Sequence, residues 1–170
     1  MPTLSPVFER LLRQARELNE LATLPDAELL RVNERVSKWS VALQLEHIGI
    51  VNTRVLDVVI PGALKDLPEH RAGRTHPAAY VMLWFNWIPR GRKAPDVVAP
   101  KSVPLTEVRA LLQKYSASLS GVEQQLIEIE RCRGCFKHPI LGPFTAAQWL
   151  RFTEVHTHHH MKLVNEIRRA

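Results

Sequence analysis

The stretch SVALQLEHIGIVNTRVLDVV, residues 40–59, decides the fold class. Its apolar residues recur every three or four positions, which is the period of one face of an α-helix. This stripe consists of Val41, Leu45, Ile48, Val51, Val55 and Val59. Trp39 and Ser40 precede the pattern, and Pro61-Gly62 follows it as a helix stop signal. The stretch therefore predicts a long helix that begins at Ser40 and ends near Pro61.

Three other stretches show the same period. One covers residues 6–22, where Ser5 is expected to cap the helix and a proline occupies the first helical position. Another covers residues 105–131, and the last covers residues 146–168, with Thr145 as the expected cap. Together with residues 40–59, they predict four long helices. A short helical turn is also expected between the first two.

The chain between the second and third long helices is rich in proline. Residues 61–104 contain seven of the twelve prolines. Each proline biases the residue before it away from helix, so residues 89–104 are expected to form an extended crossing loop. A short buried helix is expected over residues 78–87. Its aromatic residues are predicted to pack in the core or cap the bundle, with a pocket wall or a dimer surface as the alternative: Trp84, Phe85 and Trp87.

Four helical patterns without an alternating strand pattern or an internal repeat predict an all-α, four-helix bundle with a long crossover between helices two and three. The 170 residues suit one domain, spanning residues 1–170. Two cysteines cannot form a disulfide framework, which favours a cytoplasmic protein. The longest apolar run, residues 78–88, is far shorter than the roughly 20 residues of a membrane span, so no membrane partner is expected.

The net charge of +6 raises the question of nucleic-acid binding. The basic residues are scattered, and the one dense cluster is Arg90, Arg92 and Lys93. No helix-turn-helix, zinc-finger or RNP-like pattern accompanies that cluster. The excess of basic residues is therefore interpreted as a solvated surface, and no nucleic-acid partner is expected.

Histidine spacing carries the strongest chemical signal. Four of the eight histidines lie in VHTHHHM, residues 155–161. At 100° per residue, His156 and His160 share one helix face, one turn apart, a spacing that lets two imidazoles reach one metal ion. His159 is a substitute on the neighbouring face, and His158 is expected to face solvent. His47 points toward the apolar face of its own helix. The alternative interpretation is a polar surface patch and a packed core histidine.

Two motifs resemble a known family. WSVALQLEHIGI, residues 39–50, is similar to the second-helix motif of the DinB-like (YfiT-like) superfamily, in which a Trp-Ser pair opens the helix and a histidine follows. The stretch from residue 138 to residue 164 resembles the last loop and helix of a subgroup of that superfamily. Its matching residues are His138, Pro139, Gly142, Thr145, Gln148, Trp149, His156, His159 and His160. The resemblance implies an up-down-down-up four-helix bundle with three histidine ligands, which correspond to His47, His156 and His160.

Three neutral imidazoles leave coordination positions open, as in catalytic rather than structural zinc sites. Zinc or nickel is the expected ion, with iron as an alternative, because imidazole suits all of them. Members of the family that this chain resembles include metal-dependent hydrolases, and transferases or isomerases that use a low-molecular-weight thiol. We therefore predict a divalent-metal-dependent enzyme of one of these two kinds, acting on a small-molecule substrate or thiol. The alternative is a non-catalytic metal-binding or structural bundle. The sequence leaves the oligomeric state open; a homodimer is one option, because relatives often pair and the aromatic segment offers apolar surface.

No catalytic residue can be assigned from the sequence. The two carboxylates nearest the histidines in sequence, Glu46 and Glu154, are expected to point away from them. Gln44, Asn86 and Gln148 are candidate polar groups of a pocket. The run Cys132, Cys135 and His138 fits a redox pair, half a zinc site or coincidence, and coincidence is the favoured interpretation because the chain lacks a βαβ context.

Overall fold

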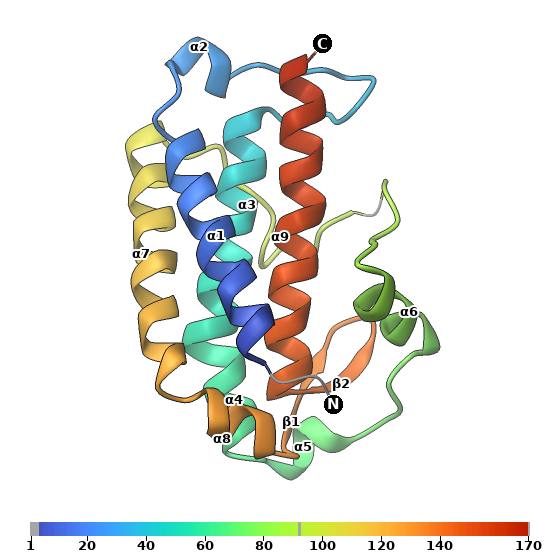
Figure 1. Ribbon diagram of the computed structural model, residues 1–170. Helices are drawn as coiled ribbons and strands as arrows, with labels where there is room; N and C mark the ends of the chain where they lie inside the picture. The colour runs from blue at the N-terminus through green and yellow to red at the C-terminus, as the bar shows by residue number, and fades with distance from the viewer. Residues whose placement is uncertain (1–3, 92, 170) are drawn as a thin grey trace.

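The computed structural model describes residues 4–91 and 93–169. Its long helices lie side by side (Figure 1): α1 (Ser5–Leu21), α3 (Val41–Arg54), α7 (Leu105–Glu123) and α9 (Ala146–Arg169). In the view of Figure 1, α1 and α9 run upward, whereas α3 and α7 run downward. The structure is mainly helical, in agreement with the predicted all-α class.

Shorter elements join the long helices. The described residues also form α2 (Asp26–Leu29), a π-helical turn η1 (Val55–Val59), α4 (Ile60–Leu64), α5 (Pro68–Arg71), α6 (Pro77–Phe85), α8 (Leu126–Arg131) and the antiparallel strands β1 (Cys135–His138) and β2 (Gly142–Thr145). The expected helical turn after α1 is thus the four-residue helix α2.

The helix that carries His47 begins as predicted but ends later. Ser40 caps α3, and its Oγ accepts a hydrogen bond from the Leu43 N–H at 3.2 Å. The expected stop at Pro61 is wrong, because the helical backbone continues through η1 into α4. In η1 the Ile60 N–H bonds to the Val55 carbonyl, and Pro61 then enters in the first turn of α4, where a proline is tolerated.

Two other helix boundaries differ from the prediction. Leu4, rather than Ser5, occupies the cap position of α1, and none of the described side chains caps this helix. Leu4 is buried and its carbonyl accepts from the Phe8 N–H, so core packing extends the helix by one residue. The predicted third helix is divided into α7 and α8, because Gln125 leaves helical geometry with φ −103° and ψ 0°.

Thr145 caps α9 as predicted. The Thr145 Oγ1 accepts from the Gln148 N–H at 3.2 Å, and the Gln148 Oε1 accepts from the Thr145 N–H at 2.9 Å. This reciprocal pair satisfies two backbone donors at the start of the helix. Gln148 is therefore a capping residue rather than a polar group of a pocket.

The hairpin that precedes α9 was not predicted. Its strands pair Cys135 with Thr145 and His138 with Gly142. Each strand has four residues, which is too short for an alternating pattern to stand out in the sequence. Gly142 has a φ of +84° at the end of the turn, a conformation that favours glycine.

The short helix α6 forms where it was expected but is not buried. Ala79 and Met82 pack inward, whereas Trp84 is 82% exposed and Phe85 is 70% exposed. Figure 1 shows α6 at the side of α9, outside the group of long helices. Because nearly every residue of α6 is apolar, the sequence predicted that the helix is buried. In the structure, α6 contacts the rest of the described residues along one narrow side only.

The core lies between the long helices and includes fully buried Leu45, Ile48, Leu112, Tyr115 and Leu150. The continuous stretch Val41–Leu64 is long and apolar enough to cross a membrane by composition, with a mean hydropathy of 1.2. However, 61% of its apolar window is buried inside the structure. That burial is typical of a central core helix.

Candidate metal centre

The structure brings three histidines together from two helices. His47 lies on α3, and His156 and His160 lie one turn apart on α9. One ring nitrogen from each lies within 4.8 Å of the others, and the His47 and His156 Nε2 atoms are 3.1 Å apart. All three side chains are buried. The predicted pairing of His47 with the His156 and His160 face is thus present in the fold.

Outer hydrogen bonds fix two of the rings. The His47 Nδ1 lies 2.8 Å from the Val98 carbonyl oxygen. The His160 Nδ1 lies 2.6 Å from the Gln44 Oε1, and the Gln44 amide donates in turn to the Ser37 Oγ at 2.9 Å. Both acceptors are oxygens, so each Nδ1 carries the proton and each Nε2 offers a lone pair. Metal-binding histidines in proteins show this arrangement.

The third ring, that of His156, is held by packing. It stacks on Phe152 with the ring centroids 5.5 Å apart. Its buried Nδ1 has no hydrogen-bond partner among the described residues. Its Nε2 faces the lone pair of the His47 Nε2. Two nitrogens bound to one tetrahedral zinc ion are about 3.3 Å apart, so their 3.1 Å separation suits a shared cation.

Burial keeps the three imidazoles neutral. Desolvation lowers the pKa of His156 and of His160 well below the usual value, and the neighbouring histidines lower both further. Burial also lowers the pKa of His47, although the Val98 carbonyl and Glu46 oppose that effect. Neutral imidazole is the form that binds a metal ion, so the site is ready for a cation at neutral pH.

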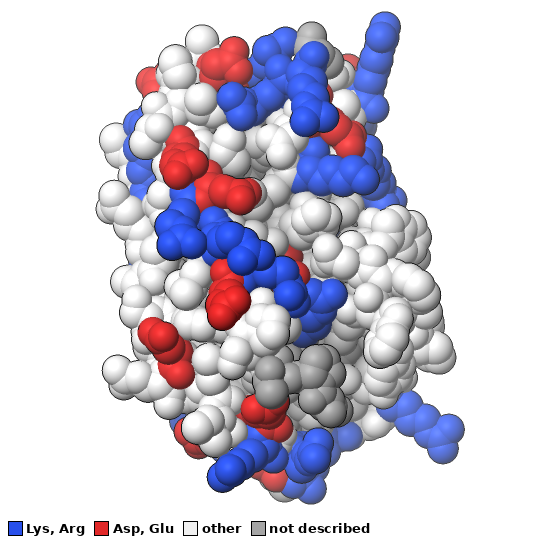
Figure 2. Space-filling model, viewed as in Figure 1, with Lys and Arg blue, Asp and Glu red and all other residues white. Residues whose placement is uncertain are grey.

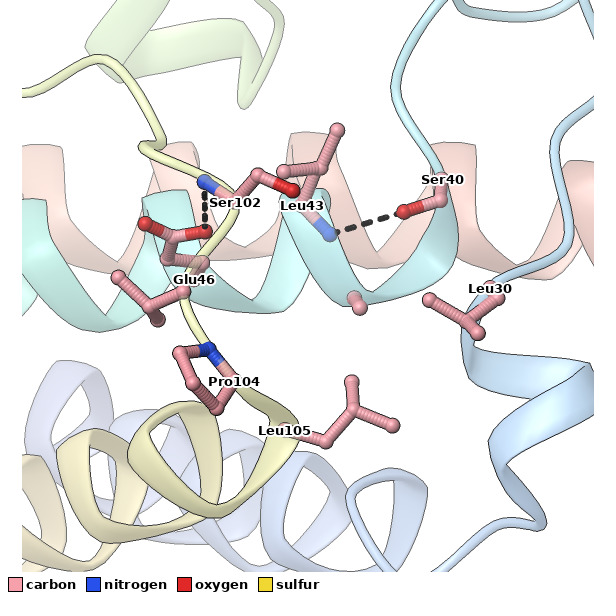
Figure 3. A pocket seen from close by; sticks show the side chains of 9 residues that line it. Leu30, Ser40, Leu43, Glu46, Ser102, Pro104 and Leu105 are labelled. Atoms are coloured by element: carbon pink, nitrogen blue, oxygen red, sulfur yellow. Dashed lines mark hydrogen bonds between the residues drawn. The ribbon is translucent and has the colours of Figure 1, made fainter.

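Glu46 holds the loop that contacts His47. This buried carboxylate accepts hydrogen bonds from the backbone N–H groups of Lys101 at 2.6 Å and Ser102 at 3.1 Å. Figure 3 shows the Glu46–Ser102 bond beside a small cavity of about 340 Å³, which lies between α3 and the start of α7. The same loop carries the Val98 carbonyl. Glu46 therefore positions the acceptor that orients His47.

Neither nearby carboxylate is placed as a base, as the sequence predicted. Glu46 is occupied by two backbone N–H groups. Glu154 is buried and forms ion pairs with Arg10, at 2.7 Å, and with Arg151. Both acids are structural, and neither has an unpaired oxygen directed at the histidines.

The histidines open onto a large cavity of about 1340 Å³. Among the described residues, five with Phe or Trp side chains line it: Trp39, Trp87, Phe136, Trp149 and Phe152. His159 also lines it, and burial lowers the pKa of His159 to about 4. His158 is exposed, as predicted. Of the three aromatic residues Trp84, Phe85 and Trp87, only Trp87 lines this cavity, so the pocket-wall alternative holds for that residue alone.

The cavity is rich in positive charge. Among the described residues, its wall contains one carboxylate, Glu34, and five basic side chains: Lys38, Arg54, Arg90, Lys93 and Lys137. Arg90 is paired with Glu166, at distances of 2.7 and 2.8 Å, and the Lys93 Nζ lies 3.5 Å from the Asp96 Oδ1, which leaves Lys38, Arg54 and Lys137. The remaining cations favour a negatively charged occupant.

The cysteines and His138 do not form a common site. Both cysteines are free. The Cys132 Sγ accepts from the Gly134 N–H at 3.3 Å, and the Cys135 Sγ contacts the Arg133 carbonyl at 3.6 Å. His138 instead turns toward the hairpin backbone and the large cavity. The geometry agrees with the interpretation of the CxxCxxH spacing as coincidence.

Sequence reasoning missed several groups around the histidines. The Val98 carbonyl leaves no side-chain signal, and the role of Glu46 depends on a loop 55 residues away. His138 was considered only as a match to the family motif and together with the cysteines, and not as a residue of the cavity wall. Asn86, a predicted pocket group, instead ends α6 in the left-handed conformation, at φ 53°. Gln44 was named correctly, and its contact is with His160.

Residues 8–164 match the sequence profile of the DinB superfamily. The chain belongs to the DinB superfamily. The match includes α3, most of α9 and all three clustered histidines. Comparisons with curated proteins and with solved structures gave no match. Family membership and the three-histidine group together fit a metal-binding site.

Proposed function

We propose that His47, His156 and His160 bind a divalent metal ion and that the protein is a metal-dependent enzyme acting on a small molecule in the adjoining cavity. One observation carries this proposal: three buried, neutral imidazoles converge at the wall of a cavity of about 1340 Å³. Zinc or nickel suits the all-nitrogen donor set, with iron as an alternative.

An ion with three protein ligands keeps a position for a further ligand, where its charge lowers the pKa of a bound water or converts a bound thiol to its thiolate. Thiol-dependent transfer fits the surrounding residues better than hydrolysis. Water activation commonly uses a neighbouring carboxylate as general base. Among the described residues, Glu46 and Glu154 are fully engaged elsewhere, and the cavity wall contains a single carboxylate, Glu34.

The chain's own residues have three roles in this proposal. Gln44 and the Val98 carbonyl hold the protons of His160 and His47 on Nδ1, which directs each Nε2 toward the shared site. Trp39 and Phe152 pack against the rings and exclude water. The basic side chains of the cavity attract an anionic substrate or thiol.

We further propose the family's up-down-down-up bundle for α1, α3, α7 and α9, with residues 65–104 as the crossover. The exposed aromatic side of α6 supports a homodimer contact. Figure 2 shows a wide area without charged residues at the side of the molecule where α6 lies. Exposed Tyr80, Trp84 and Phe85 belong to this helix. A cytoplasmic location without nucleic-acid or membrane partners remains our expectation.

Elemental analysis tests the metal site. The protein is purified without a histidine tag and without nickel resin, beside a His47→Ala/His156→Ala double variant. Near-stoichiometric metal in the parent and its loss in the variant are expected, and screens with thiol acceptors and with esters and amides would follow. A parent that contains no metal and takes up neither zinc nor nickel would overturn the proposal.

A non-catalytic metal site is the alternative, and accessibility of the ion distinguishes it. Cobalt-substituted protein is titrated with a small thiol, and the visible absorption spectrum is recorded. A thiolate charge-transfer band indicates an open position and supports the enzyme. A spectrum that does not change at any thiol concentration indicates a closed site and the non-catalytic alternative.

A further inference from the structure

His138 lies on the wall of the large cavity, and the proposed function assigns it no role. It is the last residue of β1, and its ring is only partly exposed. The ring stacks on Trp149 with the centroids 5.3 Å apart, and it meets Phe152 edge-on at 5.3 Å. These two aromatic residues come from α9, the helix that carries His156 and His160. The packing fixes the plane of the His138 ring.

The hairpin backbone fixes the position of the His138 proton. The His138 Nδ1 accepts hydrogen bonds from the N–H groups of Ile140, at 3.2 Å, and Leu141, at 3.1 Å. A nitrogen that accepts two N–H donors carries no proton, so a neutral ring must carry its proton on Nε2. Burial lowers the pKa of His138 to about 4, which keeps the ring neutral.

The Nε2–H is therefore a donor of fixed direction. It lies on the ring edge opposite the hairpin backbone, and none of the described residues accepts its hydrogen bond in the structure. A partly buried donor at a cavity wall needs an acceptor from water or from a ligand. The cavity's basic side chains make an anionic acceptor favourable.

We propose that the His138 Nε2–H is a substrate-positioning donor that binds a carboxylate oxygen of the molecule occupying the cavity. This rests on the proposed function for the identity of the cavity as the substrate site, but not on the presence of the metal ion. The assigned ligand class is a small molecule with a carboxylate. Its acidic group lies toward the hairpin, and the remainder extends toward the three histidines.

The first test measures the tautomer directly. Full-length protein labelled with ¹⁵N-histidine is freed of metal with a chelator, which is then removed by dialysis. Long-range ¹H–¹⁵N correlation spectra at pH 7 are expected to show His138 with a bare Nδ1 and a protonated Nε2. Acetate is the ligand probe, and its addition is expected to shift the Nε2–H resonance in a saturable way. A proton on Nδ1, or no shift with acetate, would overturn the proposal.

Two variants separate the donor from the structural role. His138→Asn keeps an acceptor for the turn N–H groups but removes the cavity donor, so it should fold normally and bind acetate about tenfold to a hundredfold more weakly. His138→Gln places an amide N–H near the Nε2 position and should retain most of the binding. His70→Asn is the control, because His70 stacks on Phe136 at the same hairpin. Wild-type acetate affinity in His138→Asn would overturn the assignment.

The two proposals fail separately. If the parent takes up no metal but His138 shows the expected tautomer and acetate shift, the metal site fails and the carboxylate subsite stands. If metal binds stoichiometrically and His138→Asn binds acetate as tightly as the parent, the enzyme proposal stands and the carboxylate subsite fails.

Discussion

Replacing Gln44 with methionine tests whether the outer hydrogen bonds organise the histidine cluster. Gln44 is 1% exposed, and its Oε1 lies 2.6 Å from the His160 Nδ1. Its amide also donates to the Ser37 Oγ at 2.9 Å. Methionine has a similar volume, so the substitution removes both hydrogen bonds without creating a large cavity.

The structure sets the size of the effect. One lost hydrogen bond costs about 1 kcal/mol, and a buried His160 N–H without an acceptor costs about 1–3 kcal/mol more. We therefore expect Gln44→Met to lower the free energy of unfolding of the metal-free protein by about 2–4 kcal/mol. Domains of this kind are stable by about 5–15 kcal/mol, so the variant should still fold. Loss of an outer partner should weaken metal binding by about tenfold to a hundredfold.

Two assays measure these quantities. Urea unfolding of the metal-free protein gives the stability, and competition with a chromophoric chelator gives the zinc affinity. Gln14→Met is the matched control, because Gln14 donates to the Glu154 carbonyl at 3.1 Å and contacts none of the three histidines through that bond. It should cost about 1 kcal/mol and leave zinc affinity unchanged. Zinc affinity in Gln44→Met equal to that of Gln14→Met would refute the role of Gln44 in orienting His160.

Three further predictions concern pH, the crossover loop and self-association. The folded pKa of His138, about 4, lies below the usual 6.5, so its contribution to stability is complete above pH 6.5 and is lost as the pH falls toward 4. The loss of unfolding free energy between pH 6.5 and 4, measured by urea unfolding, should therefore be smaller in His138→Asn than in the parent, by at most about 3 kcal/mol. An unchanged pH profile would contradict this prediction. Glu46→Gln turns an amide NH₂ toward a backbone N–H, so it should lower the free energy of unfolding by about 1–3 kcal/mol and weaken zinc binding. A variant as stable as the parent would argue against the role of Glu46 in holding the loop. Trp84→Glu, at an 82% exposed position, should change stability by less than about 0.5 kcal/mol but halve the molar mass in light scattering, and a monomeric parent would disprove the dimer.

Local sequence signals predicted the helices well. The Ser40 cap of α3 and the Thr145 cap of α9 depend on contacts within four residues, and both are present. The wrong predictions concern features that depend on contacts with distant parts of the chain. Pro61 does not end its helix, because it follows the π-helical turn and lies in the first turn of α4. Gly62 also leaves room for the Phe136 ring to pack closely on α4. The burial of α6 was wrongly predicted because composition cannot show whether another layer covers a helix.

The candidate site likewise has features that local sequence spacing predicts and features that only distant contacts determine. The four-residue spacing places His156 and His160 on one face of any helix, so the sequence alone determined that pair. The spacing could not distinguish His160 from His159 as the partner of His47, because the rotation of α9 against α3 makes that choice. The structure places His160 in the cluster and His159 on the cavity wall.

By itself, the sequence determined the helical class, the main helix positions and the one-turn histidine pair, because all of these depend on periodicity and on neighbours within a turn. Only the tertiary structure decided the rest. It brought the His47 and His156 Nε2 atoms to 3.1 Å across 109 residues of chain, and it supplied the Val98 carbonyl as the partner of His47. It also placed His138 on the wall of the cavity. These features depend on how buried surfaces pack against one another, and that packing joins residues whose separation in sequence carries no periodic signal.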